Sequence, residues 1–301
     1  MTTCPARAAL AGNPSDGYGG AVVAIPIPML SATVTIDASD RFGIDTIDPD
    51  LRRLLRATVD GFTESIADRT GARTTNPEIV VAASTTIPRS VGLAGSSALV
   101  VATLRALAIL AEVPWEIIPM AQLALSIERD RLGIEAGLQD RLVQSAGRPV
   151  AMQFDPVAVR LVSLPADAAI FVAWRSDAAE DSGVVHRPLR RRFDDADPVV
   201  VSTMHALAAE GRLAASAIDA GDLEGLGRAM DRSFDLRVSM MPVAPSQHAL
   251  VEIGRRAGAA MNSAGSGGSV VGLVTAIDRL VDVVDAYRSA GHGCVIVSDG
   301  S

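Results

Sequence analysis

The segment from Pro88 to Ala98 places glycine and serine in one short turn, and it constrains the fold more than any other stretch. It reads Pro88-Arg-Ser-Val-Gly-Leu-Ala-Gly-Ser-Ser-Ala98. The β-branched run Ile79-Val-Val precedes it, and an apolar run without Gly or Pro, from Ala98 to Leu110, follows. The turn is therefore expected between a strand and a helix.

Such a turn can hold phosphate. Gly92 and Gly95 can adopt positive φ and leave no side chain between the backbone and a ligand. Ser96 and Ser97 can cap the following helix, whose free N–H groups and dipole favour an anion. The pattern predicts a nucleotide-phosphate loop made of Pro88, Gly92, Leu93, Ala94, Gly95, Ser96, Ser97 and Ala98. A turn that only caps a buried helix remains the alternative.

The composition indicates a globular protein, with 301 residues of which 49% are hydrophobic and 21% charged. No apolar run approaches the roughly 20 residues that a membrane helix needs, and no signal peptide is visible. We therefore expect a cytoplasmic protein with no membrane partner. The net charge of −8 gives no reason to expect nucleic acid. Cys4 and Cys294 are expected to be free thiols.

The chain contains no lysine, so all 27 basic residues are arginine. This excludes the Walker A loop, which requires Gly-Lys-[Ser/Thr]. Any positive charge used on phosphate must come from arginine, from Mg²⁺ or from a helix terminus.

Hydrophobic periodicity predicts an α+β chain whose two halves, 1–165 and 166–301, meet near Pro165. A polar segment from Arg175 to His186 resembles a surface loop. Strands are expected at 6–11, 21–25, 32–36, 79–81, 151–154, 157–162, 169–174, 260–261, 270–274 and 294–298. Helices are expected at 49–68, 98–110, 120–131, 198–219, 223–240, 246–260 and 276–289.

Two more glycine turns accompany the first, one within residues 6–20 (ARAALAGNPSDGYGG) and one at 263–269 (SAGSGGS). In their order and spacing the three turns resemble the motifs of the GHMP kinases, the galactokinase, homoserine, mevalonate and phosphomevalonate kinase superfamily. The resemblance implies a two-domain α+β fold. Its N-terminal ATP-binding domain would be ribosomal-protein-like and its C-terminal domain ferredoxin-like.

Within this superfamily, several segments resemble those of the glucuronokinases: 11–20, 132–141, 181–186, 256–260 and 265–268. The resemblance implies transfer of a phosphoryl group from Mg·ATP to a sugar hydroxyl, with D-glucuronate converted to glucuronate 1-phosphate. Another sugar or isoprenoid-precursor kinase on the same fold is the first alternative. A catalytically silent protein that binds nucleotide and sugar is the second. The oligomeric state is not readable from the sequence.

The resemblance also assigns the catalytic residues. Asp140 would orient or deprotonate the acceptor hydroxyl, and Arg7 would lie near the transferred phosphate. From the residues alone, Asp140 could instead be a helix N-cap, and Arg7 a structural arginine at a strand end.

A Mg²⁺ ion would be held by the Glu128 carboxylate and by the hydroxyl of Ser97, with Ser96 as an equal choice. Without the family context, Glu128 would be an exposed helical carboxylate paired with Arg129 or Arg131.

The acceptor sugar is expected at the first glycine turn, where Asn13, Ser15, Asp16 and Tyr18 could bind ring hydroxyls or could simply be good turn residues. For the carboxylate of a sugar acid, Arg141 is the first candidate, followed by Arg187 and Arg190. His186 could bind the substrate or be an ordinary surface histidine. Gly267 and Gly268 are expected to pack the third turn against the phosphate loop and the acceptor.

Overall fold

The computed structural model describes residues 1–70, 78–175 and 183–297. The chain forms two compact units, and neither is a continuous half of the sequence. The first unit contains Met1–Ala6, Leu30–Ile87 and Ala94–Gly147, and the second contains Arg7–Met29, Pro88–Leu93 and Arg148–Ser301. A single boundary near Pro165 does not describe these units and stays a prediction about domains.

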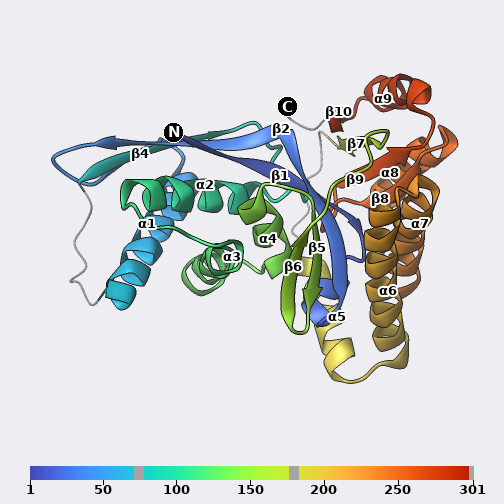
Figure 1. The fold of residues 1–301 in the computed structure, drawn as a ribbon, viewed down its shortest axis with the longest axis horizontal. Helices are drawn as coiled ribbons and strands as arrows, with labels where there is room; N and C mark the ends of the chain where they lie inside the picture. Colours follow the sequence, from blue (N-terminus) through green and yellow to red (C-terminus); the bar gives the residue numbers. More distant parts are fainter. Residues whose placement is uncertain (71–77, 176–182, 298–301) are drawn as a thin grey trace. The chain divides into compact units, whose positions relative to one another are not determined.

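In its described residues, the first unit packs α-helices against a small sheet (Figure 1). The second part of β2 (Ala21–Ala38) pairs antiparallel with β4 (Ile79–Thr85), and β3 (Gly43–Asp45) pairs parallel with β4. The helices are α1 (Pro49–Thr70), α2 (Gly95–Leu110), α3 (Ile117–Ser126) and α4 (Leu138–Ala146). Most of α2 is buried, and α1, α3 and α4 all contact it, as expected of a helix that is apolar around its circumference.

The second unit contains the first part of β2, which pairs with β5 (Val150–Phe154), and β6 (Val157–Leu161) follows on β5. Its other sheet has the order β10-β7-β9-β8, from strands Gly293–Val297, Ala169–Trp174, Ser269–Val274 and Ala260–Ser263. The helices are α5 (Gly183–Asp194), α6 (Pro198–Ala220), α7 (Leu223–Met240), α8 (Pro245–Arg256) and α9 (Leu280–Ser289). Helices α6 and α7 lie side by side (Figure 1).

The core of the second unit lies between its four-stranded sheet and its helices. Phe171 on β7 and Tyr287 on α9 are fully buried, with ring centroids 5.5 Å apart. Met261 on β8 belongs to the same cluster. The third glycine turn connects β8 to β9 within this packed region, so its backbone is held from both ends.

Most predicted elements are confirmed, and the differences have physical causes. The strands expected at 21–25 and 32–36 are one strand, β2. Pro26 and Pro28 lie between the residues that pair with β5 and those that pair with β4, so the missing N–H groups interrupt neither of these ladders. The strand β1 (Thr2–Ala11) also begins earlier than expected.

The helix expected at 120–131 ends at Ser126 and continues as a single π-helical turn over Ile127–Arg131. The loop expected from Arg175 to His186 is wrong from Gly183 onward, because α5 begins at that residue. Residues 176–182 lie outside the described residues. In the part of the chain that the structure describes, no helix is long and apolar enough to cross a membrane.

Candidate active site

The N-terminus of α2 follows the phosphate-loop candidate and offers backbone donors. Ala94 precedes the helix in the left-handed region, at φ 61°, and no side chain caps the first turn. The prediction that Ser96 or Ser97 caps the helix is therefore wrong, because both hydroxyls donate elsewhere. The N–H groups of the first turn keep their capacity to bind an anion.

Gly92 has φ 73°, as expected, whereas Gly95 begins α2 without positive φ. Two other residues of this loop, Ser90 and Ala94, also have positive φ. The sequence analysis did not predict this.

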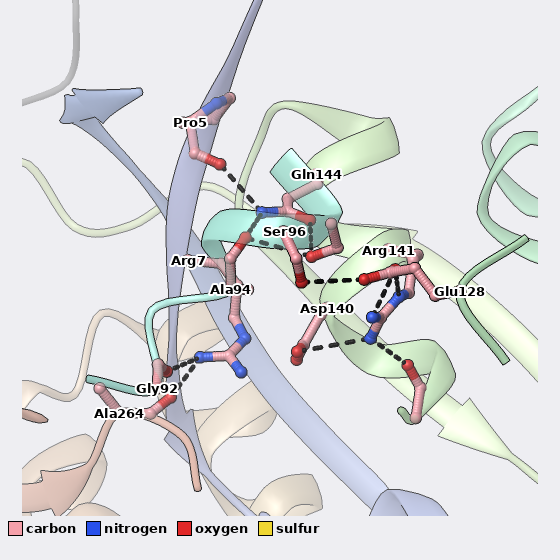
Figure 2. A network of polar contacts seen from close by, with 12 residues as sticks. Pro5, Arg7, Gly92, Ala94, Ser96, Glu128, Asp140, Arg141, Gln144 and Ala264 are labelled. Atoms are coloured by element: carbon pink, nitrogen blue, oxygen red, sulfur yellow. Dashed lines mark hydrogen bonds and ion pairs between the residues drawn. The ribbon is translucent and has the colours of Figure 1, made fainter. Parts of the chain in front are cut away.

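Ser96, Glu128 and Arg141 form a chain of polar contacts in the first unit (Figure 2). Ser96 Oγ donates to Glu128 Oε1 at 2.9 Å. Arg141 donates to the other carboxylate oxygen, Oε2, from Nε at 2.7 Å and from Nη2 at 2.5 Å. The Glu128 side chain is 0% exposed and that of Arg141 is 4% exposed. The alternative of an exposed Glu128 is therefore wrong, and its charge is balanced by Arg141.

Ser97 takes part in a different network, centred on Gln144 of α4. Ser97 Oγ donates to Gln144 Oε1 at 2.6 Å, and Gln144 Nε2 donates to the carbonyls of Ala94 and Pro5. Both side chains are fully buried. The structure thus brings Ser96 to Glu128 and directs the Ser97 hydroxyl to Gln144.

Asp140 lies within the first turn of α4, whose N-cap is Gly137, so the N-cap alternative for Asp140 is wrong. Its carboxylate Oδ2 is 3.5 Å from Arg141 Nη1, and its side chain is 22% exposed. Arg141 Nη1 also donates to the Gly137 carbonyl at 2.8 Å. Asp140 is consequently more accessible than Glu128, and Arg141 is committed to partners within the protein.

The residues present fit a Mg²⁺ ion that takes only a few protein ligands. Ser96 Oγ and Glu128 Oε1 are hard oxygen donors only 2.9 Å apart, and Mg²⁺ in phosphoryl-transfer sites is held by one or two protein oxygens together with substrate phosphates. Among the described residues, no group of three His, Cys, Asp or Glu side chains could hold a metal ion. Any magnesium site here would therefore depend on the nucleotide for its remaining ligands.

In the second unit, Arg7 connects two glycine turns (Figure 2). Its Nη1 donates to the carbonyls of Gly92 at 2.8 Å and Ala264 at 2.9 Å. The turns approach closely, because a Cβ on Gly92 would lie 2.6 Å from the Gly267 carbonyl oxygen. A Cβ on Gly268 would meet Val91 Cα at 3.0 Å. The expected packing of the third turn against this end of the phosphate loop is present.

Arg237 on α7 is a residue that the sequence analysis did not select. It is 4% exposed and donates to the carbonyls of Gly265 and Ser266, each at 2.9 Å. The signal was an arginine on the apolar stripe of a helix, since Met230 and Phe234 precede it at helical spacing and are buried.

The acceptor-turn residues divide into two pairs. Asn13 and Ser15 are buried and engaged in the fold: Asn13 Nδ2 donates to the Ser263 carbonyl, and Ser15 Oγ donates to the Ala21 carbonyl. Asp16 and Tyr18 are only partly buried. Burial raises the pKa of the Tyr18 hydroxyl, and nearby Arg190 opposes that effect.

Arg190 on α5 is the carboxylate candidate that the structure brings to the first glycine turn. Its Nη1 donates to the Gly17 carbonyl at 2.9 Å, and its guanidinium carbon lies 5.5 Å from the centre of the Tyr18 ring. Its side chain is 58% exposed and also pairs with Asp194. His186 and Arg187 fall within α5, but their side chains lie outside the described part of the structure.

Comparison with known proteins supplies the family. The model described as GHMP kinases N terminal domain matches residues 56–148, and that of the GHMP kinases C terminal matches residues 214–292. A curated protein of Arabidopsis thaliana named "Probable glucuronokinase 2" is 32% identical over 306 residues, which cover 88% of this chain and 82% of that protein.

Solved structures of low identity show the same fold. Lactococcus lactis galactokinase complexed with galactose matches with a TM-score of 0.79 at 16% identity, covering 100% of this chain and 93% of that one. Streptococcus pneumoniae phosphomevalonate kinase, in complex with phosphomevalonate and AMPPNP, matches with a TM-score of 0.76 at 16% identity, covering 98% and 99%. The two-domain fold that the three glycine turns imply is thereby confirmed.

Proposed function

Because this chain belongs to the GHMP kinases and is a sugar kinase, we propose that it transfers the terminal phosphoryl group of ATP to D-glucuronate, giving glucuronate 1-phosphate. The identity to a plant glucuronokinase over most of the chain supports this acceptor. The single structural observation that supports catalysis is the Ser96–Glu128 oxygen pair beside the uncapped N-terminus of α2.

In the proposed reaction, the anomeric hydroxyl oxygen of the sugar attacks the terminal phosphorus. The new O–P bond forms as the bond from that phosphorus to the bridging oxygen of ADP breaks. Asp140 takes the proton from the attacking hydroxyl, and Arg7 offsets the charge of the transferred group. Mg²⁺, when bound through Ser96 and Glu128, supplies further neutralisation of the phosphate oxygens.

We propose Arg190 as the partner of the uronate carboxylate. Arg141 is less suited to this role, because three of its donor atoms are engaged with Glu128 and Gly137 and its side chain is buried. Arg190 is exposed and lies beside Tyr18 and Gly17. An arginine there could present its planar group to a carboxylate.

The test is a panel of acceptors with Mg·ATP, scored by ADP release. Glucuronate should be turned over with a higher kcat/KM than glucose, galactose or mevalonate. Preference for a neutral sugar or for mevalonate would contradict the acceptor proposal but leave the kinase family untouched. Nucleotide binding with no turnover of any acceptor would favour a regulatory binding protein.

A further inference from the structure

Two arginines hold consecutive carbonyl groups of the third glycine turn in the second unit. Arg7 binds the carbonyl of Ala264, and Arg237 binds those of Gly265 and Ser266. In a trans peptide the C=O of one residue and the N–H of the next point in opposite directions. The N–H groups of Ser266 and Gly267 must therefore point away from the Arg237 guanidinium.

These two N–H groups are available to a ligand. Among the described residues, neither donates a hydrogen bond to the protein. Both residues are partly exposed, unlike their neighbours Gly265 and Gly268. A Cβ on Gly92 would lie 3.2 Å from Ser266 N and 3.1 Å from Gly267 N, so any side chain at that position would cover the two nitrogens. Successive N–H groups arranged in this way form an anion-binding nest.

The charge of Arg237 also calls for an anion. Among the described residues its buried Nε has no hydrogen-bond partner, and its Nη1 and Nη2 donate to the uncharged carbonyls of Gly265 and Ser266. Burial lowers the pKa of Arg237 to about 10, while the charge of Asp16 acts in the opposite direction. The guanidinium is thus still positive at neutral pH, and it polarises the two peptide groups whose carbonyls it binds.

We propose that the Ser266 and Gly267 N–H groups bind an oxyanion, the terminal phosphate of the nucleotide, and that Arg237 is the positioning residue that fixes and polarises them. The phosphate is favoured because Gly92, which faces the two nitrogens, belongs to the predicted phosphate loop. This inference rests on the proposed function only through its use of ATP, and it holds for any acceptor.

The experiment compares the binding of ADP and of AMPPNP to the full-length protein by calorimetry in the presence of Mg²⁺. Arg237→Met should weaken AMPPNP binding by about tenfold or more and leave ADP binding close to wild type. Arg237→Lys, which keeps the charge but cannot bridge two carbonyls, should shift the same ratio by less. Arg228→Met is the control, because Arg228 lies on the same helix, is 69% exposed and pairs with Asp222 and Glu224.

A ratio of ADP to AMPPNP affinity equal to wild type in either folded Arg237 variant overturns the proposal, as does equal weakening of both nucleotides. If Arg237→Met does not fold, the affinity ratio measured for Arg237→Lys tests the proposal. A shifted ratio without turnover of glucuronate would support this inference and count against the proposed acceptor. Normal glucuronate turnover with an unshifted ratio would contradict this inference and support the proposed acceptor.

Discussion

Arg141 donates from Nε and Nη2 to one oxygen of Glu128, so the other oxygen of that carboxylate is the one that meets Ser96. Both charged side chains are buried. A buried pair of this kind stabilises little relative to an apolar pair, but removal of one partner leaves an uncompensated charge.

Arg141→Met should therefore destabilise the protein by about 3–5 kcal/mol. The measurement is the free energy of unfolding in urea. In the double variant Arg141→Met/Glu128→Gln much of that loss should be recovered, because no buried charge remains. A stability loss below about 1 kcal/mol in the single variant, typical of an exposed ion pair, would contradict the structural role and return Arg141 to the list of substrate contacts.

Asp140→Asn should lower kcat for glucuronate by about 10²–10⁴-fold, because an amide cannot accept the hydroxyl proton. Nucleotide affinity should survive. The matched control is Asp130→Asn, since Asp130 is exposed in the π-helical turn. ADP release measured over a range of acceptor concentrations separates kcat from KM, and an unchanged kcat in Asp140→Asn would remove this residue from catalysis.

Ser96→Ala and Ser97→Ala should fail in different ways, although the residues are adjacent. Loss of the Ser96 hydroxyl should raise the Mg²⁺ concentration needed for half-maximal activity, because Ser96 faces Glu128 Oε1. Loss of the Ser97 hydroxyl should lower stability by about 1 kcal/mol, because it leaves Gln144 without a buried donor. Mg²⁺ titrations and urea unfolding on both variants check this. The opposite pattern would assign the metal to Ser97.

Arg190→Gln should reduce kcat/KM for glucuronate by about tenfold or more, with a much smaller effect on a neutral sugar that is a substrate. The physical reason is the loss of a charged donor for the carboxylate. Arg160→Gln is the control, as Arg160 is similarly exposed and pairs with Asp219. Equal losses for the acidic and the neutral sugar would show that Arg190 does not read the carboxylate.

The two buried cysteines predict a loss of stability in alkali. Burial raises the pKa of the Cys4 thiol to about 12, and that of Cys294 to about 12. Above pH 9 the unfolded thiols lose protons that the folded protein retains. Stability should then fall as pH rises, by about 1.4 kcal/mol per pH unit for each thiol.

The measurement is urea unfolding between pH 8 and pH 11, with Cys4→Ala/Cys294→Ala compared to wild type. Burial, and after it the charge of Cys294, raises the pKa of the Tyr287 hydroxyl, so the single variant Cys4→Ala, which leaves Cys294 in place, isolates the contribution of Cys4. Parallel slopes would mean that the folded thiols ionise normally.

Much of the fold could be predicted because its signals are local. The glycine turns, the apolar run of α2 and the periodic helices each occupy a short window of sequence. The pairing of Glu128 with Arg141 could not be predicted in this way. The two residues are 13 positions apart, and they meet only after a π turn and the start of α4. The local pattern predicted that Glu128 lies on a helix, but it did not show which face of that helix is buried.

The role of Arg237 could not be predicted from the sequence for another reason. Its partners are backbone carbonyls 28 and 29 positions away, and carbonyl groups carry no sequence signature. The adjacent serines of the phosphate loop show the same limit, because composition could not say which hydroxyl faces Glu128. In these cases the residue types were visible, and the direction of each side chain required tertiary structure.

The π-helical turn over Ile127–Arg131 makes the number of residues in this segment important for the geometry of the site. Its wide ring, closed by the Leu132 N–H on the Ile127 carbonyl, contains one residue more than an α-helical turn. Deletion of Asp130 would remove no side chain that binds Glu128, yet it would shorten the chain leading to Asp140 and Arg141. In homologues and in engineered libraries, the length of this segment should consequently be as intolerant of change as the identity of the acidic residues it separates.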